Sequence, residues 1–318
     1  MATLSPGKAR RLASTATPEG VFTILAVDHR DSLRVVLAPD DPASVPAAEL
    51  TALKLDLVRG VGEAASAVML EPEYSAAQAI VSGALSGRVG FLAAVEAQGY
   101  LGDPTARQTV LHEGWSVAKA SRLGADGIKL LVLYRPDSGD VAEAQEATIR
   151  EVVADCARFD IPLFLEPLLY ARDGAGDDRR ALVVETVRRL GALDPDVLKV
   201  QFPLDTGAVT DRAAWRDACA ELDETAIVPW ALLSGGGSFE TFREQLSVAC
   251  EHGASGFMVG RALWGEYATA PAARRPALLD SLVRPRFAEL SAIVRETGRH
   301  WGECYADAVI DERWYLGY

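Results

Sequence analysis

The chain has 318 residues, of which 49% are hydrophobic and 24% are charged, and its formal net charge is −13. This length suits one large domain, and no apolar stretch is long enough to span a membrane. The acidic balance excludes a nucleic-acid-binding protein, because no basic stripe with interleaved aromatic residues is present. Residues 1–20 are polar and lack the hydrophobic core of a signal peptide, so we expect a cytoplasmic protein without membrane partners.

Eight short apolar runs predict buried strands, at residues 21–27, 67–70, 89–95, 127–133, 162–165, 197–202, 226–233 and 256–259. Stretches with helical periodicity, such as 142–159 and 178–190, separate most of them. This repeated alternation with continuously apolar strands predicts an α/β protein with a closed (β/α)8 TIM barrel. A dinucleotide-binding sheet is the weaker alternative, since no Gly-x-Gly-x-x-Gly follows the first run.

One domain is expected over residues 1–318, with a barrel core at about 20–270 and a C-terminal helical extension at about 271–318. The extension should close the bottom of the barrel or build a subunit interface. The loop at 172–180, rich in Gly and Asp, follows the fifth predicted strand. Because loops after barrel strands surround the catalytic face, this loop is a candidate lid.

Three ionisable groups lie on consecutive predicted strands: Lys129, Glu166 and Lys199. Burying an ammonium ion favours the neutral amine, and a neutral lysine is the nucleophile of enzymes that form Schiff bases. We therefore interpret Lys199 as a nucleophile and Glu166 as a proton shuttle that serves the carbinolamine. Lys129 has two interpretations, a direct catalytic part or a structural cation that neutralises Asp28 or Glu166.

The last two predicted strands are followed by sequences typical of phosphate-binding loops. Glycine-rich turns present backbone N–H groups, and a guanidinium can bind a phosphate with two hydrogen bonds. These loops predict a phosphate site made of Ser234, Gly235, Gly236, Gly260 and Arg261. The alternative is that the glycines only make tight turns from strand to helix.

Neither a metal nor any other cofactor is expected. The four histidines are scattered, whereas a zinc site needs several of them around one ion, and only His29 falls at the end of a predicted strand. The four cysteines stand far apart, as is typical of separate thiols in a reducing compartment. A magnesium site made of Asp28, Glu71 and Glu166 stays open as an alternative.

Together the strand motifs resemble the class I aldolases of the tagatose-1,6-bisphosphate aldolase family, including its sulfofructose-1-phosphate aldolase branch. The matching stretches are Ala-Val-Asp-His-Arg-Asp at 26–31, Lys-Leu-Leu-Val-Leu-Tyr-Arg at 129–135, Leu-Glu-Pro at 165–167, Leu-Lys-Val-Gln-Phe-Pro at 198–203, Pro-Trp-Ala-Leu-Leu-Ser-Gly-Gly at 229–236 and Gly-Ala-Ser-Gly-Phe-Met-Val-Gly-Arg-Ala at 253–262. They occur in order over most of the chain.

The resemblance implies a metal-independent lyase that cleaves a phosphorylated ketose into dihydroxyacetone phosphate and an aldehyde. It implies that Lys199 forms the imine, that Glu166 and Lys129 assist proton transfer, and that Asp28 contacts substrate hydroxyl groups. The expected partners are a small sugar phosphate and further copies of the chain, in a dimer or tetramer.

The resemblance also implies substrate contacts for His29, Arg30 and Arg135, and Arg135 favours the sulfosugar branch. His29 stands where the family usually has glutamine, and Gln201 stands where it usually has glutamate. These two departures point to a different sugar phosphate.

Two other functions remain open on the same barrel. An isomerase or epimerase could use Glu166 as base and Lys129 as electrophile. A non-catalytic sensor could bind a sugar phosphate without cleaving it.

Overall fold

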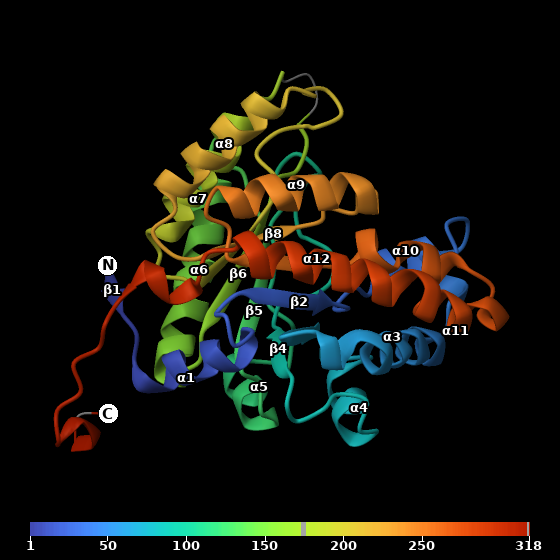
Figure 1. Ribbon diagram of the computed structural model, residues 1–318, viewed down its shortest axis with the longest axis horizontal. Helices are drawn as coiled ribbons and strands as arrows, with labels where there is room; N and C mark the ends of the chain where they lie inside the picture. Colours follow the sequence, from blue (N-terminus) through green and yellow to red (C-terminus); the bar gives the residue numbers. More distant parts are fainter. Residues whose placement is uncertain (173–175, 317) are drawn as a thin grey trace.

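A closed barrel of parallel strands forms the centre of the protein (Figure 1). The computed structural model describes residues 1–172, 176–316 and 318. The barrel strands follow one another in chain order: β2 (Phe22–Ala26), β3 (Ala67–Leu70), β4 (Gly90–Ala94), β5 (Gly127–Leu133), β6 (Leu163–Leu168), β7 (Val197–Val200), β8 (Trp230–Leu233) and β9 (Gly256–Val259). Each predicted run overlaps one of these strands, so the predicted TIM barrel is confirmed. The predicted lid, 172–180, includes residues 173–175, which lie outside the described residues.

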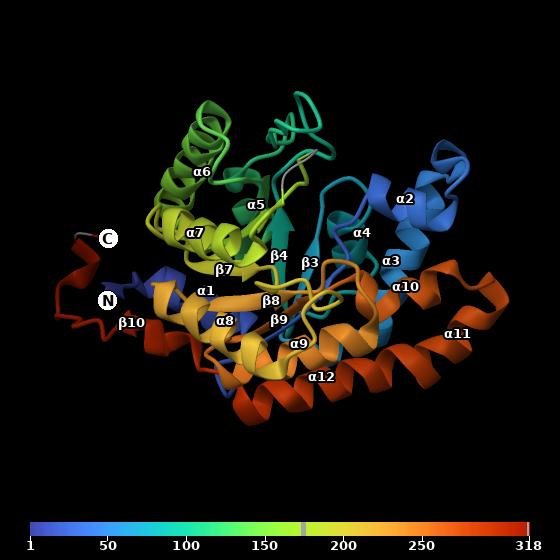
Figure 2. The ribbon, with the colours of Figure 1, turned by 90° about the horizontal axis from the view of Figure 1, so that it is seen from above.

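Helices surround the strands (Figures 1 and 2). Those that alternate with the strands are α2 (Asp31–Leu37), α3 (Ala47–Val61), α4 (Ala76–Val81), α5 (Val117–Leu123), α6 (Asp140–Arg158), α7 (Arg179–Gly191), α8 (Arg212–Thr225), α9 (Phe239–Glu251) and α10 (Arg261–Thr269). Those that precede or follow the barrel are α1 (Pro6–Thr15), α11 (Arg275–Leu278) and α12 (Arg284–Thr297). Within the described part of the chain, no helix combines the length and apolar composition needed to cross a membrane.

Helix α6 illustrates how the local sequence sets these elements. Its buried apolar residues, from Ala142 to Cys156, lie three, four or seven positions apart, so they share the face that packs against the barrel. Asp140 and Glu143 lie in its first turn and Arg158 in its last, where their charges complement the helix dipole.

Two strand boundaries lie three or more residues from the prediction. Strand β6 extends to Leu168, because it pairs with β5 as far as Leu133. Strand β8 begins only at Trp230, because the N–H of Ala226 still caps helix α8 by bonding to the carbonyl of Leu222.

The strands alternate between two apolar cores. On β7, Leu198 and Val200 belong to the core between the barrel and the helices, whereas Val197 belongs to the core inside the barrel. Side chains two positions apart on a strand share a face, so Lys199 points inward like Val197. The same alternation from Phe164 directs Glu166 inward on β6.

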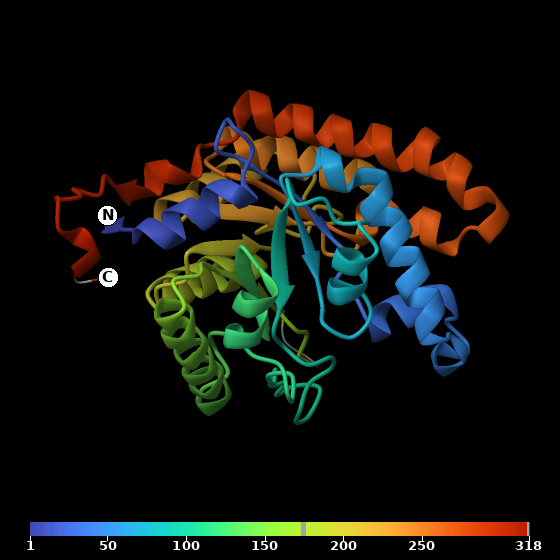
Figure 3. The same cartoon turned by 90° about the horizontal axis from the view of Figure 1, so that it is seen from below.

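The two ends of the chain lie side by side (Figures 1 and 2), where β1 (Ala2–Thr3) pairs with β10 (Tyr305–Ala306). Leu12 of α1 is fully buried in the core inside the barrel, and Trp301 packs against that core. The hydroxyl of Tyr305 donates a hydrogen bond to the carbonyl of Asp196, just before β7. The N-terminal end of the barrel is therefore covered, and the chain after β10 projects away from the body (Figure 3).

Candidate active site

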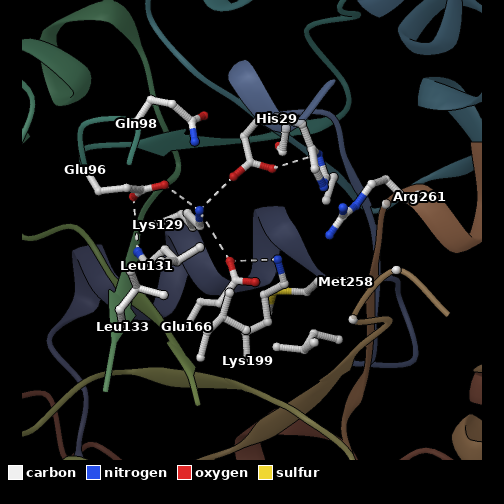
Figure 4. Close-up of a pocket in the computed structure, with 18 of the residues that line it drawn as sticks. His29, Glu96, Gln98, Lys129, Leu131, Leu133, Glu166, Lys199, Met258 and Arg261 are labelled. Carbon is white, nitrogen blue, oxygen red and sulfur yellow. Dashed lines mark hydrogen bonds and ion pairs between the residues drawn. The ribbon is translucent and has the colours of Figure 1, made fainter. Parts of the chain in front are cut away.

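A cavity of about 480 Å³ opens at the C-terminal ends of the strands (Figure 4). Residues on or after every barrel strand except β3 line it. The sequence-predicted residues in its lining are Asp28, His29, Arg30, Lys129, Glu166, Lys199, Ser234, Gly235, Gly236, Gly260 and Arg261. The barrel thus brings together groups that are more than 230 positions apart in the sequence.

Lys199 and Glu166 form an ion pair inside the cavity (Figure 4). The Nζ of Lys199 lies 2.8 Å from Oε2 of Glu166, and the same oxygen lies 3.3 Å from the Nζ of Lys129. Burial alone would raise the pKa of Glu166, but the positive charges of Lys199 and Lys129 outweigh it and lower that pKa. Glu166 is therefore a carboxylate shared by two lysines, within direct reach of a proton on Lys199.

Lys129 is a buried cation surrounded by carboxylates. Its Nζ lies 2.7 Å from Oδ2 of Asp28 and 2.5 Å from Oε1 of Glu96, in addition to its contact with Glu166. Burial alone would lower the pKa of Lys129, but these three carboxylates raise it well above its usual value. Burial likewise opposes ionisation of Asp28, yet Lys129 and Lys199 hold the pKa of Asp28 well below its usual range. Lys129 thus neutralises both Asp28 and Glu166, the two carboxylates considered when Lys129 was interpreted as a structural cation.

His29 presents a neutral imidazole to the cavity. Burial lowers its pKa to about 3, while Asp28 opposes this shift and Arg261 adds to it. The ring packs edge-on against Trp264, with the centroids 5.1 Å apart, and its Nδ1 lies 3.8 Å from Oδ1 of Asp28. A Cβ on Gly260 would come within 2.7 Å of the imidazole, so glycine leaves room for the ring.

The predicted phosphate loops meet at one side of the cavity. Gly235 and Gly236 have φ angles of +58° and +81°, which glycine adopts without strain. A Cβ on Gly236 would lie 3.1 Å from Cζ of Arg261, so the guanidinium approaches the backbone of the loop closely. Among the described residues Arg261 has no ion-pair partner, which leaves its charge available to an anion.

Arg30 lines the cavity but is anchored to the neighbouring loops. Its Nη2 donates to the carbonyl of Glu96 at 2.7 Å, and its Nη1 lies 3.4 Å from Oε1 of Glu73. Arg30 therefore connects the end of β2 to the segments after β3 and β4.

Two residues considered from the sequence lie outside the cavity. The guanidinium of Arg135 is bound by Asp137, by Asp177 and by the carbonyl of Tyr170. The carboxylate of Glu71 is fully buried against Lys54, which removes it from the alternative magnesium site. In the part of the chain that the structure describes, no three His, Cys, Asp or Glu residues are grouped so that they could hold a metal ion.

Several lining residues were absent from the predicted site. Glu96, Gln98, Tyr100 and Arg107 belong to the segment after β4, which antiparallel bridges fold into a hairpin. Tyr170 follows β6. Glu96 was recognisable as a polar residue at a strand end, but the others lie on loops without a sequence signal for the cavity.

Comparisons with known proteins agree with this geometry. The model of the DeoC/LacD family aldolases matches residues 22–266. The tagatose 1,6-diphosphate aldolase of Streptococcus agalactiae serotype V is 29% identical over 325 aligned positions, covering 94% of this chain and 99% of that protein. The tagatose 1,6-diphosphate aldolase of Lactococcus lactis subsp. lactis is 31% identical, covering 82% of this chain and 86% of that protein.

Solved structures share the fold at lower identity. An archaeal fructose 1,6-bisphosphate aldolase superimposes with a TM-score of 0.62 and 21% identity, covering 90% of this chain and 98% of that one. The fructose-bisphosphate aldolase of Plasmodium falciparum gives a TM-score of 0.69 at 17% identity, covering 93% and 97%. With the family model matched across the whole barrel, the chain belongs to the DeoC/LacD family of aldolases and is a lyase.

Proposed function

We propose that this aldolase cleaves a phosphorylated ketose into dihydroxyacetone phosphate and an aldehyde through an imine on Lys199. The observation that carries the proposal is the ion pair between the inward-pointing Lys199 and Glu166, at 2.8 Å, beside the loops at 234–236 and 260–261, which suit a phosphate. Family membership favours this aldol cleavage over an isomerase, an epimerase or a sensor.

The first steps follow from the ion pair. Glu166 accepts a proton from Lys199, and the freed amine attacks the substrate carbonyl carbon to form a carbinolamine. Glu166 then returns a proton to the departing hydroxyl, so water leaves and the imine forms. Lys129 keeps its charge throughout, and it holds Glu166 and Asp28 in place for these transfers.

Carbon–carbon cleavage uses the protonated imine as an electron sink. A base removes the proton from the C4 hydroxyl, the C3–C4 bond breaks, and its electron pair moves into the enamine on Lys199. The aldehyde leaves, the enamine takes up a proton at C3, and water releases dihydroxyacetone phosphate. We assign Asp28 and His29 to contacts with substrate hydroxyl groups, and the loops at 234–236 and 260–261 to the phosphate.

The similarity to tagatose 1,6-diphosphate aldolases, which extends over nearly the full length of the chain, supports a ketose phosphate of that class. A homo-oligomer and a cytoplasmic location are further parts of this proposal. Support for the oligomer comes from exposed apolar side chains near the C-terminus, among them Val309 and Leu316. Light scattering on the full chain measures the subunit number directly.

Borohydride trapping tests the imine. Wild-type protein incubated with dihydroxyacetone phosphate, borohydride and a chelator should gain one reduced adduct, which peptide mass spectrometry should place on Lys199. The Lys199→Ala variant should gain none, whereas Lys119→Ala, which removes an exposed lysine of α5, should keep the full label. Absence of label on the wild type, or full label on Lys199→Ala, would refute the mechanism.

A further inference from the structure

Tyr170 carries a buried hydroxyl group that has no hydrogen-bond partner among the described residues. The residue follows β6, lines the cavity and is only 3% exposed. Among the described residues no donor or acceptor reaches its buried hydroxyl oxygen. A buried polar group without a hydrogen bond costs roughly 1–3 kcal/mol, so such groups are rare unless a ligand completes them.

Hydrogen bonds from neighbouring loops hold the backbone around Tyr170 in place. Arg135 donates from Nη1 to the carbonyl of Tyr170 at 3.0 Å, and its two Nη atoms bind the carboxylate of Asp177 at 2.7 and 2.8 Å. The N–H of Leu169 donates to Oε1 of Gln201 at 2.8 Å. Arg135, after β5, therefore holds the backbone of Tyr170, Gln201, after β7, holds the residue before it, and Asp177 fixes the guanidinium of Arg135.

The order of the strands around the barrel places Tyr170 away from the predicted phosphate loops. The phosphate loops follow β8 and β9, Lys199 lies on β7, and Tyr170 follows β6. Figure 4 shows Arg261 on one side of the Lys199–Glu166 pair and Leu131 and Leu133 of β5 on the other. A ketose with its phosphate near Arg261 and its carbonyl at Lys199 can extend its remaining carbons over Glu166, toward the ends of β5 and β6.

From this arrangement we infer that the Tyr170 hydroxyl binds a hydroxyl group on the aldehyde half of the substrate, which makes Tyr170 a specificity-determining residue. The inference rests on the proposed function, since it uses the imine on Lys199 to orient the substrate. A phenol is a neutral donor and acceptor, and the Gln201 amide next to its backbone is neutral as well. Both suit a sugar hydroxyl. Arg135, predicted to bind substrate, is instead the residue that positions Tyr170.

The test separates the two halves of the reaction in the Tyr170→Phe variant. The half-reaction with dihydroxyacetone phosphate alone is followed by exchange of its C3 proton with solvent and by borohydride trapping. This half does not involve the aldehyde, so both should match the wild type. The full reaction is followed as condensation of dihydroxyacetone phosphate with glyceraldehyde or with propionaldehyde, which has the same carbon chain without the hydroxyl groups.

With glyceraldehyde, kcat/KM of Tyr170→Phe should fall about tenfold, as expected for the loss of one buried hydrogen bond. With propionaldehyde it should change by less than about twofold, so that the preference of the wild type for glyceraldehyde shrinks. Arg135→Lys, which keeps the positive charge but loses the planar guanidinium, provides a second variant. Its kcat/KM should also fall with glyceraldehyde and not with propionaldehyde.

Tyr134→Phe is the matched control. The hydroxyl of this buried tyrosine donates to Oε1 of Glu146 at 2.8 Å, outside the cavity lining. Its loss should lower the melting temperature and leave the half-reaction with dihydroxyacetone phosphate and both condensations unchanged. Tyr170→Phe should show the opposite pattern, with no loss of melting temperature, because no residue in the described part of the chain bonds to its hydroxyl.

Two outcomes overturn the inference. One is an unchanged preference for glyceraldehyde in Tyr170→Phe, and the other is an equal loss with both aldehydes. Failure of the proposed function looks different, because wild-type protein would then neither exchange the C3 proton of dihydroxyacetone phosphate nor be labelled by borohydride.

Discussion

Lys129→Met tests whether the buried cation stabilises the site through its charge. Methionine has a similar length and is apolar, so the substitution removes the ammonium and leaves Asp28, Glu96 and Glu166 behind. Each carboxylate oxygen lies within 3.3 Å of the same nitrogen, so any two of them are less than about 7 Å apart. At an effective dielectric constant of about 20, like charges at about 6 Å repel by about 3 kcal/mol.

Removing one partner from a buried ion pair typically costs about 3–5 kcal/mol, and we expect the free energy of unfolding to fall by about that amount at pH 7. Urea denaturation followed by circular dichroism measures it. Lys119→Met is the matched control, since Lys119 is exposed on α5, and it should change the free energy of unfolding by less than about 0.5 kcal/mol.

The pH dependence gives the sharper result. In the wild type, the lowered pKa values of Asp28 and Glu166 mean that their stabilisation is present above the unfolded values, near 4, and is lost only as the pH falls through the folded values. In Lys129→Met the repelling carboxylates take up protons more readily in the folded protein. The loss in free energy of unfolding relative to the wild type should therefore be smaller at pH 5 than at pH 7. A loss in free energy of unfolding of less than about 1 kcal/mol at pH 7, or a loss that is equal at both pH values, would refute the reasoning.

Three further predictions follow from the site. The pKa of His29 falls to about 3 in the folded protein, so the unfolded chain binds more protons than the folded protein below about pH 6.5. The free energy of unfolding of the wild type should therefore fall by about 2 kcal/mol more than that of His29→Gln between pH 7 and pH 5, as measured by urea titration. Arg261→Ala should weaken binding of dihydroxyacetone phosphate by roughly 10- to 100-fold in calorimetry, because a charge-assisted contact is lost, and unchanged affinity would remove Arg261 from the phosphate site. If Arg135 acts through Tyr170, the effect of Arg135→Lys on condensation with glyceraldehyde should largely disappear in a Tyr170→Phe background, whereas independent roles would give additive losses in kcat/KM.

The sequence by itself determined the barrel and the polar residues at most of its strand ends. Apolar runs, helical periodicity and the side-chain alternation within a strand are local properties, so they locate Lys199, Glu166 and Lys129 without knowledge of any distant contact. The glycine-rich turns are local as well, and they mark the loops that meet Arg261.

Only the tertiary structure decided which of these groups meet. Closure of the barrel brings Glu96 to Lys129, turns Glu71 toward Lys54 and assigns Arg135 to the backbone of Tyr170. These contacts join residues 17 to 35 positions apart, through loops whose paths depend on packing against neighbouring strands. A residue's own sequence neighbours carry no signal for such contacts, because the energy that selects a partner for a buried charge or hydroxyl arises only when the surrounding chain has excluded water.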